Sequence, residues 1–189
     1  ITIGCGVPGE LAGSLLAAGR LGERDRLVVT DFRVRGADSA LGAVVSEAVR
    51  AQLGQSDVIG ILSPSAIAAT LRRMEREPGT PVDLAVAREI AQREGAKAVV
   101  DGDVTPLGAG YVVTLRLVTA DSGAELASFR ETADSPKDLL PTIDKLARQL
   151  RGKIGESLRT VHAGPPLVQV TTPSLEALKK YAEGVRIND

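Results

Sequence analysis

The sequence predicts an α/β fold, a two-layer sandwich in which helices pack on a mixed sheet of about five strands. Residues 95–134 hold three consecutive strand patterns with glycine-containing turns between them. Two short apolar runs, 26–32 and 58–62, alternate with segments of helical periodicity. A long apolar stripe at helical spacing follows the three strands and needs a sheet to cover. The predicted order is β-α-β-α-α-β-β-β-α, with a further helix at the C-terminal end.

The first strand and the first helix are predicted in residues 26–54. Arg26 to Phe32 is a compact apolar run bounded by charged residues, which is typical of a buried strand. The helix begins after Ser39 as cap and stops at Gly54. Its apolar residues, at spacings of three and four, are Leu41, Val44, Val45, Ala48, Val49 and Leu53.

The next three elements are a short strand and two helices. Val58 to Leu62 is a second buried strand, and Ser63-Pro64 begins a helix that runs through Met74. After the break at Pro78-Gly79, residues 80–83 open a third helix with a pattern like a capping box, and Gly95 closes it.

The three strands that follow alternate apolar and polar residues. They are predicted around 98–104, 111–118 and 126–129, and short glycine-containing turns join them into an antiparallel meander. Ser135-Pro136 then begins the longest helix, whose apolar stripe continues to Leu158. Its members are Leu139, Leu140, Ile143, Leu146, Leu150, Ile154 and Leu158.

The chain divides into four predicted regions. Residues 1–25 form an N-terminal membrane-proximal segment, 26–159 the α/β domain, 160–173 a Gly/Pro/Thr linker, and 174–189 a last helix. The chain starts at Ile1 without a methionine, which suggests that an upstream part is missing. Residues 11–18 are interpreted either as the end of a cut membrane segment or as a short soluble helix.

Composition excludes several functional classes. The 189 residues carry a net charge of −1 and only 2% aromatic residues, which favours neither nucleic-acid binding nor base stacking. Cys5 and His162 are single residues of their kinds, so the sequence predicts neither an internal disulfide nor a zinc cluster. No run of about 18 apolar residues marks a spanning helix.

Three stretches resemble the TolB amino-terminal-like domain. They are Val28-Val-Thr-Asp-Phe32, then 90–104 with its helix-glycine-strand pattern, then the strand and turn of 112–126. The resemblance covers residues 26–159 and implies a scaffold without catalytic residues. The tail, 171–185, is similar to the first helix of a tetratricopeptide array.

The combined resemblance implies a place in a larger protein. In bacterial transmembrane Ser/Thr kinases a domain of this kind sits between a membrane helix and such repeats, outside the cytoplasm. We therefore expect an extracytoplasmic sensor or protein-interaction domain of a membrane-anchored signalling protein. Its partners are proteins, not nucleic acid, and the membrane is reached only through a missing upstream anchor.

The main alternative is a dinucleotide site. Gly4, Gly6 and Gly9 form a literal G-x-G-x-x-G, and Asp31 ends the following strand. Glycines let the backbone approach pyrophosphate, and an acid binds the ribose hydroxyls. Against this, the preceding strand is short, Pro8 adjoins the third glycine, and a meander replaces further βα units. A third hypothesis is a structural assembly subunit of an envelope complex.

Four weaker signals have a structural interpretation beside a functional one. Cys5 is a lipid-attachment candidate, although the sequence lacks an upstream signal segment. The glycine in Asp101-Gly-Asp103 is interpreted as a bulge or a close backbone approach. The alternative is that the two acids bind a metal ion. His162 is expected to be solvated, as is the cluster of Arg72, Arg73 and Arg76. Neither catalytic residues, a metal nor a cofactor is predicted beyond these alternatives.

Overall fold

The computed structural model describes residues 13–36, 39–77 and 79–167, and the account below concerns these residues. The helices are α1 (Ser39–Leu53), α2 (Pro64–Arg73), α3 (Leu84–Glu94), the short 3₁₀ helix η1 (Pro136–Asp138), α4 (Leu139–Ile154) and α5 (Leu158–Ala163). The strands are β1 (Arg26–Val29), β2 (Arg33–Val34), β3 (Gly60–Ile61), β4 (Ala98–Leu107), β5 (Gly110–Thr119) and β6 (Glu125–Ala133).

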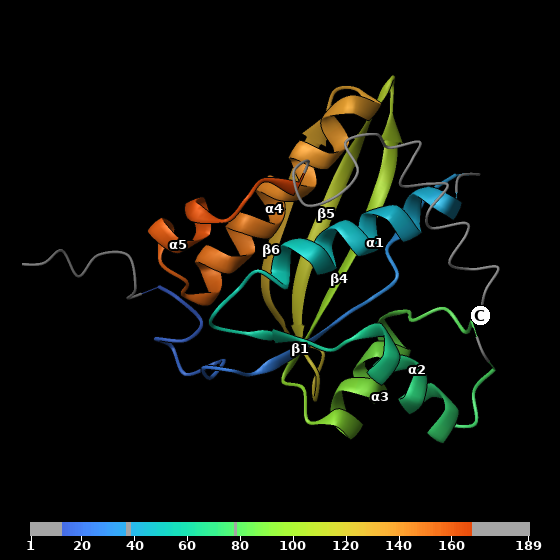
Figure 1. The fold of residues 1–189 in the computed structure, drawn as a ribbon. Helices are drawn as coiled ribbons and strands as arrows, with labels where there is room; N and C mark the ends of the chain where they lie inside the picture. The colour runs from blue at the N-terminus through green and yellow to red at the C-terminus, as the bar shows by residue number, and fades with distance from the viewer. Residues whose placement is uncertain (1–12, 37–38, 78, 168–189) are drawn as a thin grey trace, which may run out of the picture.

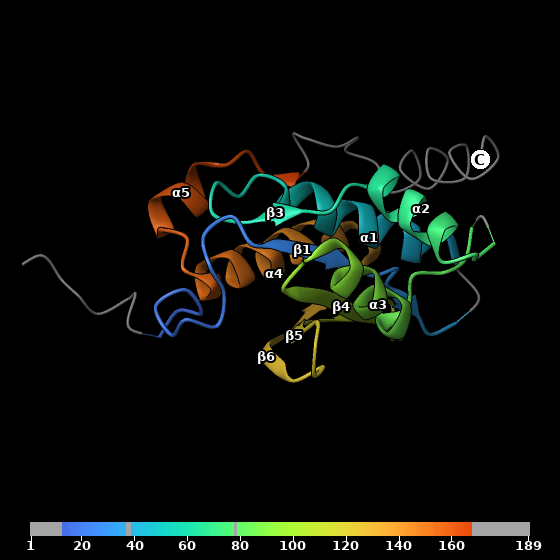
Figure 2. The ribbon, with the colours of Figure 1, turned by 90° about the horizontal axis from the view of Figure 1, so that it is seen from below.

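The strands form one mixed sheet, which confirms the predicted α/β class. Its order is β3-β1-β4-β5-β6, and the short β2 continues the line of β1 along β4. β1 runs parallel to β3 and β4, whereas β4, β5 and β6 form the predicted antiparallel meander. Figure 2 shows the strands in this succession, with β6 at the far edge from β3.

Helices lie on both faces of the sheet, which corrects the prediction of two layers. The larger core joins α1 and α4 to one face, and these helices lie side by side in Figure 1. A smaller core joins α2 and α3 to the other face through Val28 and Val99. The parallel part of the sheet is therefore the middle of three layers. The β5–β6 part has helices on one face only.

The helix boundaries follow from the predicted capping residues. Asp83 accepts a hydrogen bond from the Val86 N–H at 2.9 Å at the start of α3, and Gly95 ends this helix in the left-handed conformation, with φ of 68°. Ser63 caps α2 in the same way, with Pro64 in its first turn. These polar contacts satisfy backbone groups that the helix itself leaves unpaired.

Two regions at the ends of the domain differ from the predicted boundaries. α4 ends at Ile154, because Gly155 turns the chain at φ of 129°, and α5 is a separate helix that reaches into the predicted linker. Residues 13–25 pack on the domain: Leu15 and Leu21 are buried in the larger core, and the Leu15 N–H bonds to the Lys153 carbonyl.

The last two expectations concern a membrane-spanning helix and the tetratricopeptide-like helix. In the described part of the chain, every helix is too short or too polar to cross a bilayer. The predicted tetratricopeptide-like helix at 174–189 lies outside the described residues.

Candidate functional site

The outer edge of β6 is the longest open strand edge among the described elements. β6 has nine residues and pairs with β5 on one side only. Among the described strands none pairs with its other side. At about 3.3 Å per residue, the open edge is roughly 30 Å long. Its free N–H and C=O groups can bind an added strand.

The side of β6 that faces the helices is anchored to α4. Ala127 and Phe129 are half-buried against the larger core. Glu131 accepts hydrogen bonds from Lys145 Nζ at 2.9 Å and Gln149 Nε2 at 3.0 Å, both on α4. The bonds from Lys145 and then Gln149 hold the pKa of Glu131 below its usual range, so this carboxylate stays charged. These contacts fix the edge strand in place.

The opposite face of β5 and β6 is polar and open. Ser128, Arg130 and Thr132 are exposed at alternate positions along β6. Across the sheet, Arg116 lies opposite Ser128, and Thr114 lies opposite Arg130. The second core reaches this face of β5 only at its end, through Val118. Polar residues of neighbouring strands therefore form one continuous surface beside the edge.

A buried carboxylate supports this surface from β4. Asp101 is 1% exposed and accepts a hydrogen bond from Thr30 Oγ1 at 3.2 Å. Arg116 forms an ion pair with it from β5, and Arg33 forms a longer one of 3.5 Å from β2. Two guanidinium groups thus share one carboxylate. The described residues contain no cluster of three potential metal ligands, and the side-chain partners of Asp101 are a hydroxyl and two guanidinium groups.

Gly102, between these acids, is a place of close backbone approach. A Cβ atom added here would overlap the ring of Phe32 and the carbonyl oxygen of Thr114. The β4–β5 register runs unbroken from Ala98 to Leu107, so there is no bulge at this glycine. Of the two predicted interpretations, the structure confirms close approach.

Asp31, the predicted ribose-binding acid, connects two segments of the fold. Its carboxylate accepts from the Val82 N–H at 2.8 Å and from Arg50 Nη2 at 3.2 Å. Its own N–H donates to the Val82 carbonyl at 2.9 Å. Gly4, Gly6 and Gly9, like Cys5, lie outside the described residues. The dinucleotide site therefore stays a prediction, with Asp31 engaged in structural contacts.

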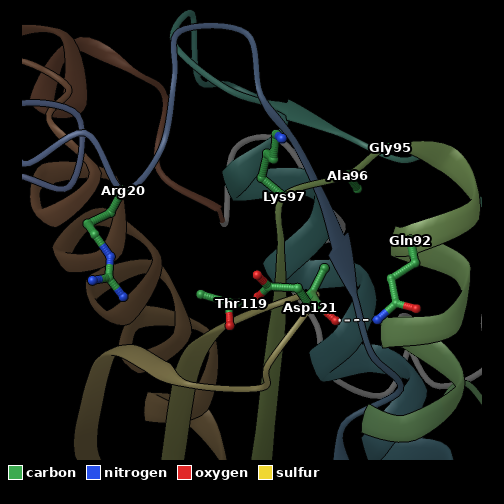
Figure 3. Close-up of a pocket in the computed structure, with 8 residues that line it drawn as sticks. Arg20, Gln92, Gly95, Ala96, Lys97, Thr119 and Asp121 are labelled. Carbon is green, nitrogen blue, oxygen red and sulfur yellow. Dashed lines mark hydrogen bonds between the residues drawn. The ribbon is translucent and has the colours of Figure 1, made fainter.

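A small pocket of about 310 Å³ lies where β4 begins and β5 ends. Figure 3 shows Arg20 to the left of Thr119 and Lys97 above it, with Asp121 on the other side of Thr119 from Arg20. Gln92 closes one wall by donating to the Ala120 carbonyl at 2.9 Å. A bond from the Ser122 N–H lowers the pKa of Asp121. The pocket offers charges for a small polar group but neither histidine nor cysteine.

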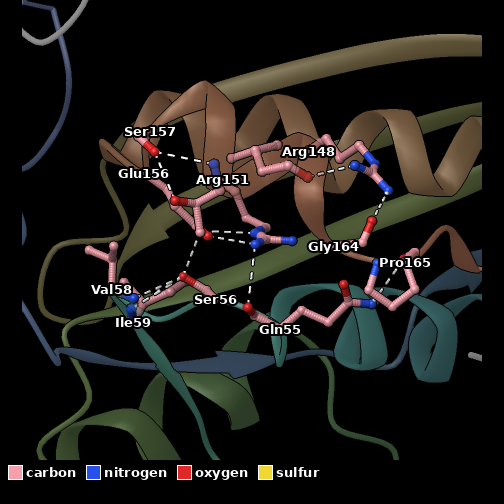
Figure 4. A network of polar contacts seen from close by, with 12 residues as sticks. Gln55, Ser56, Val58, Ile59, Arg148, Arg151, Glu156, Ser157, Gly164 and Pro165 are labelled. Carbon is pink, nitrogen blue, oxygen red and sulfur yellow. Dashed lines mark hydrogen bonds and ion pairs between the residues drawn. The ribbon is translucent and has the colours of Figure 1, made fainter.

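A buried ion pair that sequence reasoning missed joins three parts of the chain. Arg151 of α4 pairs with Glu156, and both side chains are 1% exposed. Ser56 Oγ donates to Glu156 at 2.8 Å and in turn accepts from the Val58 and Ile59 N–H groups (Figure 4). The signal was present in the sequence: Arg151 follows Ile143 and Ala147 at helical spacing, on the buried stripe of α4.

His162, the other isolated candidate, is exposed on α5. It borders a groove of about 320 Å³ between α4 and α5, beside Arg148 and Val161. Arg148 donates to the carbonyl groups of Val161 and Gly164 and so fastens α5 to α4. The groove is therefore the space beside the contact that holds α5 on α4.

Comparison with solved structures relates the fold to bacterial proteins. The C-terminal domain of LpoB from Escherichia coli superposes with a TM-score of 0.53 at 15% identity, over 61% of this chain and 86% of that one. The same domain from Salmonella enterica gives 0.51 at 16% identity, over 65% and 92%. TolB from Acinetobacter baumannii gives 0.48 at 10% identity, over 71% and 29%, which is too low to carry an argument.

Other comparisons give no match. No known family model matches the chain, and neither does any curated protein. At these identities the likeness to the LpoB domains establishes a shared fold alone. The expected kinase parent and tetratricopeptide repeats find no support in it and stay predictions.

Proposed function

We propose that this chain is a non-catalytic protein-interaction domain of a bacterial envelope protein, exposed outside the cytoplasm. The open edge of β6, with the polar face beside it, is the observation that carries the proposal. Strand addition to such an edge supplies backbone hydrogen bonds to a partner without requiring any reactive side chain. The fold shared with the LpoB C-terminal domains supports an envelope setting.

The finer proposal concerns the parent protein. The sequence resemblance to the TolB amino-terminal-like domain and to a first tetratricopeptide helix supports a membrane-anchored signalling protein, with a Ser/Thr kinase domain upstream. In that arrangement the domain senses or transmits a signal by binding another protein. Fusion of alkaline phosphatase to the end of the chain in its native bacterium tests the topology. Enzyme activity supports an extracytoplasmic domain, and an inactive, intact fusion contradicts it.

Site-specific photo-crosslinking tests the interaction edge. A benzoylphenylalanine is placed at Ser128 or Thr132, which are exposed on β6, in the complete protein in its native bacterium. Arg72, exposed on α2, is the matched control position. We expect the same discrete adduct from both β6 positions and none from Arg72. If neither β6 position gives an adduct, or Arg72 gives the same one, the proposed edge is wrong.

The crosslink also distinguishes a partner from self-assembly. An adduct of twice the mass of the chain, containing only its own peptides, would show that copies pair with each other. Light scattering of the purified protein at high concentration then decides the case. A stable oligomer in solution supports the structural-subunit hypothesis, whereas an adduct that contains another protein's peptides, formed by a chain that is monomeric in solution, supports a different protein as the partner.

A further inference from the structure

We propose that the pocket beside Asp121 binds a small acidic amino acid such as glutamate. The proposal goes beyond the interaction edge, because the pocket lies where β4 begins and β5 ends, and β6 contributes none of its lining residues. The volume of about 310 Å³ is sufficient for a molecule of this size. The observation that carries the proposal is a set of three charged side chains that line one pocket and lack partners of opposite charge.

Three separate segments supply these charges. Arg20 belongs to the N-terminal segment, Lys97 precedes β4, and Asp121 lies in the turn after β5 (Figure 3). In the part of the chain that the structure describes, the side chains of Arg20 and Lys97 form neither an ion pair nor a hydrogen bond. The Asp121 carboxylate accepts a hydrogen bond from the Ser122 N–H at 2.6 Å, which lowers its pKa and keeps it charged.

Other charged residues near the pocket do not neutralise its lining. Glu94 forms an ion pair with Arg73, away from the lining residues. Arg88 donates to two carbonyl groups of the β5–β6 turn, and Glu125, on β6, is outside the lining. The pocket itself therefore presents two unpaired positive charges and one unpaired negative charge.

The backbone that carries the two cations is held in place. The Lys97 N–H donates to the Arg26 carbonyl, and the Lys97 carbonyl accepts from the Ala120 N–H, both at 3.0 Å. The Arg20 N–H donates to the carbonyl of Leu15 at 2.9 Å, and the Leu15 side chain is buried in the larger core. A ligand would therefore order side chains but not the main chain, which lowers the entropic cost of binding.

The charge pattern determines the class of ligand. Each cation can bind a carboxylate, and the Asp121 carboxylate can bind an ammonium group. A molecule with two carboxylates and one ammonium group complements all three side chains and removes the positive surplus of the lining. A simple diacid is repelled by Asp121, and an amino acid with an uncharged side chain leaves one cation unpaired. An acidic amino acid fits this pattern best.

Three probes that differ by one group test the proposal on the complete chain. They are L-glutamate, L-glutamine, which lacks the side-chain charge, and glutarate, which lacks the ammonium group. Amide shifts of the isotope-labelled protein, recorded by NMR at low salt, report both the position and the affinity of binding. We expect glutamate to shift the amides of Lys97, Thr119 and Asp121 and to bind about fivefold more tightly than either analogue.

Matched variants test the role of each charge. Asp121→Asn keeps an oxygen for the Ser122 N–H; it should weaken glutamate about fivefold and strengthen glutarate, because it removes both the attraction for ammonium and the repulsion of the diacid. Arg20→Gln should also weaken glutamate about fivefold, whereas Arg72→Gln makes the same change of charge on α2 and should leave affinity unchanged. Both arginines are exposed, so these variants should keep the thermal stability of the parent chain.

Several outcomes would overturn the proposal. They are equal binding of glutamate and either analogue, amide shifts away from the pocket, and equal losses of affinity in R20Q and R72Q. The absence of a saturating shift at up to about 10 mM glutamate would overturn it as well. None of these results concerns β6, whose test is the crosslinking experiment, so failure of the pocket leaves the proposed interaction edge unaffected.

Discussion

Gly102 sets how closely the chain between β1 and β2 approaches β4. Phe32 lies over this glycine, and the residue before it, Asp101, holds Thr30 and Arg33. Gly102 and Asp101 therefore hold the same segment, residues 30–33, from the two faces of β4. A small residue flanked by acids gives a specific packing geometry that needs no ligand.

Replacement of Gly102 by alanine should lower the free energy of unfolding by about 3 kcal/mol, because the added methyl group overlaps both Phe32 and the Thr114 carbonyl. Urea unfolding followed by circular dichroism measures the change. Gly152→Ala is the matched control: this glycine lies within α4 with open space around it, and alanine there should add about 0.5–1 kcal/mol. Equal stability of the two variants would contradict the close approach.

The pair Arg151–Glu156 should make stability depend on acid. Burial alone would raise the pKa of Glu156, but hydrogen bonds from Arg151 and Ser56 outweigh it and lower that pKa below 4.5. The stabilisation is therefore present above pH 4.5 and is lost as pH falls through the lower folded-state value.

Glu156→Gln should remove this dependence and lower the free energy of unfolding by about 3 kcal/mol at pH 7, because it leaves a buried arginine without its counter-charge. Unfolding curves between pH 7 and pH 3 measure both effects, with the variant losing less stability than the parent chain on acidification. Glu23→Gln, on a turn in the N-terminal region, is an exposed control. If E156Q loses as much unfolding free energy between pH 7 and pH 3 as the parent chain, Glu156 is not the source of the acid dependence.

At the scale of elements, Asp31 connects β1 to the segment that leads into α3. Asp31→Ala removes the acceptor for the Val82 N–H and the partner of Arg50, and should cost about 2 kcal/mol. Thermal unfolding checks this, and Asp57→Ala, at the loop before β3, is the control. If D31A keeps its melting temperature but abolishes a thermal shift with NAD that the parent chain shows, the dinucleotide hypothesis replaces the structural one.

Sequence patterns predicted nearly every element but not every boundary or face. The apolar stripe of α4 continues past Ile154, so periodicity extended the helix through Gly155 although the backbone turns there. Amphipathic helices reveal that they cover a sheet, not which face. A signal for two covered faces existed, because Leu27-Val28-Val29 and Ala98-Val99-Val100 are continuous apolar runs rather than alternating ones.

The interaction edge was predictable only in part. The three strands of the meander were visible in residues 95–134, and so was the possibility that one of them forms an edge. Which strand lies outermost depends on the insertion of β1 between β3 and β4, which is a long-range pairing. Similarly, the environment of Asp101 comes from Thr30 and Arg33, far away in sequence. Local patterns do not contain such contacts.

At the scale of the whole molecule, two cores share one sheet. Val28 and Val99 belong to the smaller core, while their neighbours Leu27, Val29 and Val100 belong to the larger one. Each of the two central strands therefore contributes to both cores with alternate residues. Loss of either core exposes one face of β1 and β4, so the described domain should unfold as one cooperative unit.

Two truncations, one in each core, test this cooperativity. Ile90→Ala in α3 and Leu146→Ala in α4 remove side chains that are 0% exposed, and each should cost about 2–5 kcal/mol. Hydrogen exchange of the slowest amides in β5 is the decisive measurement, since β5 packs against α4 and meets the smaller core only at its end, through Val118. Both variants should speed this exchange in proportion to their loss of global stability, because only global unfolding opens the central strands. Faster exchange confined to α2 and α3 in I90A, with β5 unchanged, would show instead that the smaller core opens alone and that the interaction edge is stable without it.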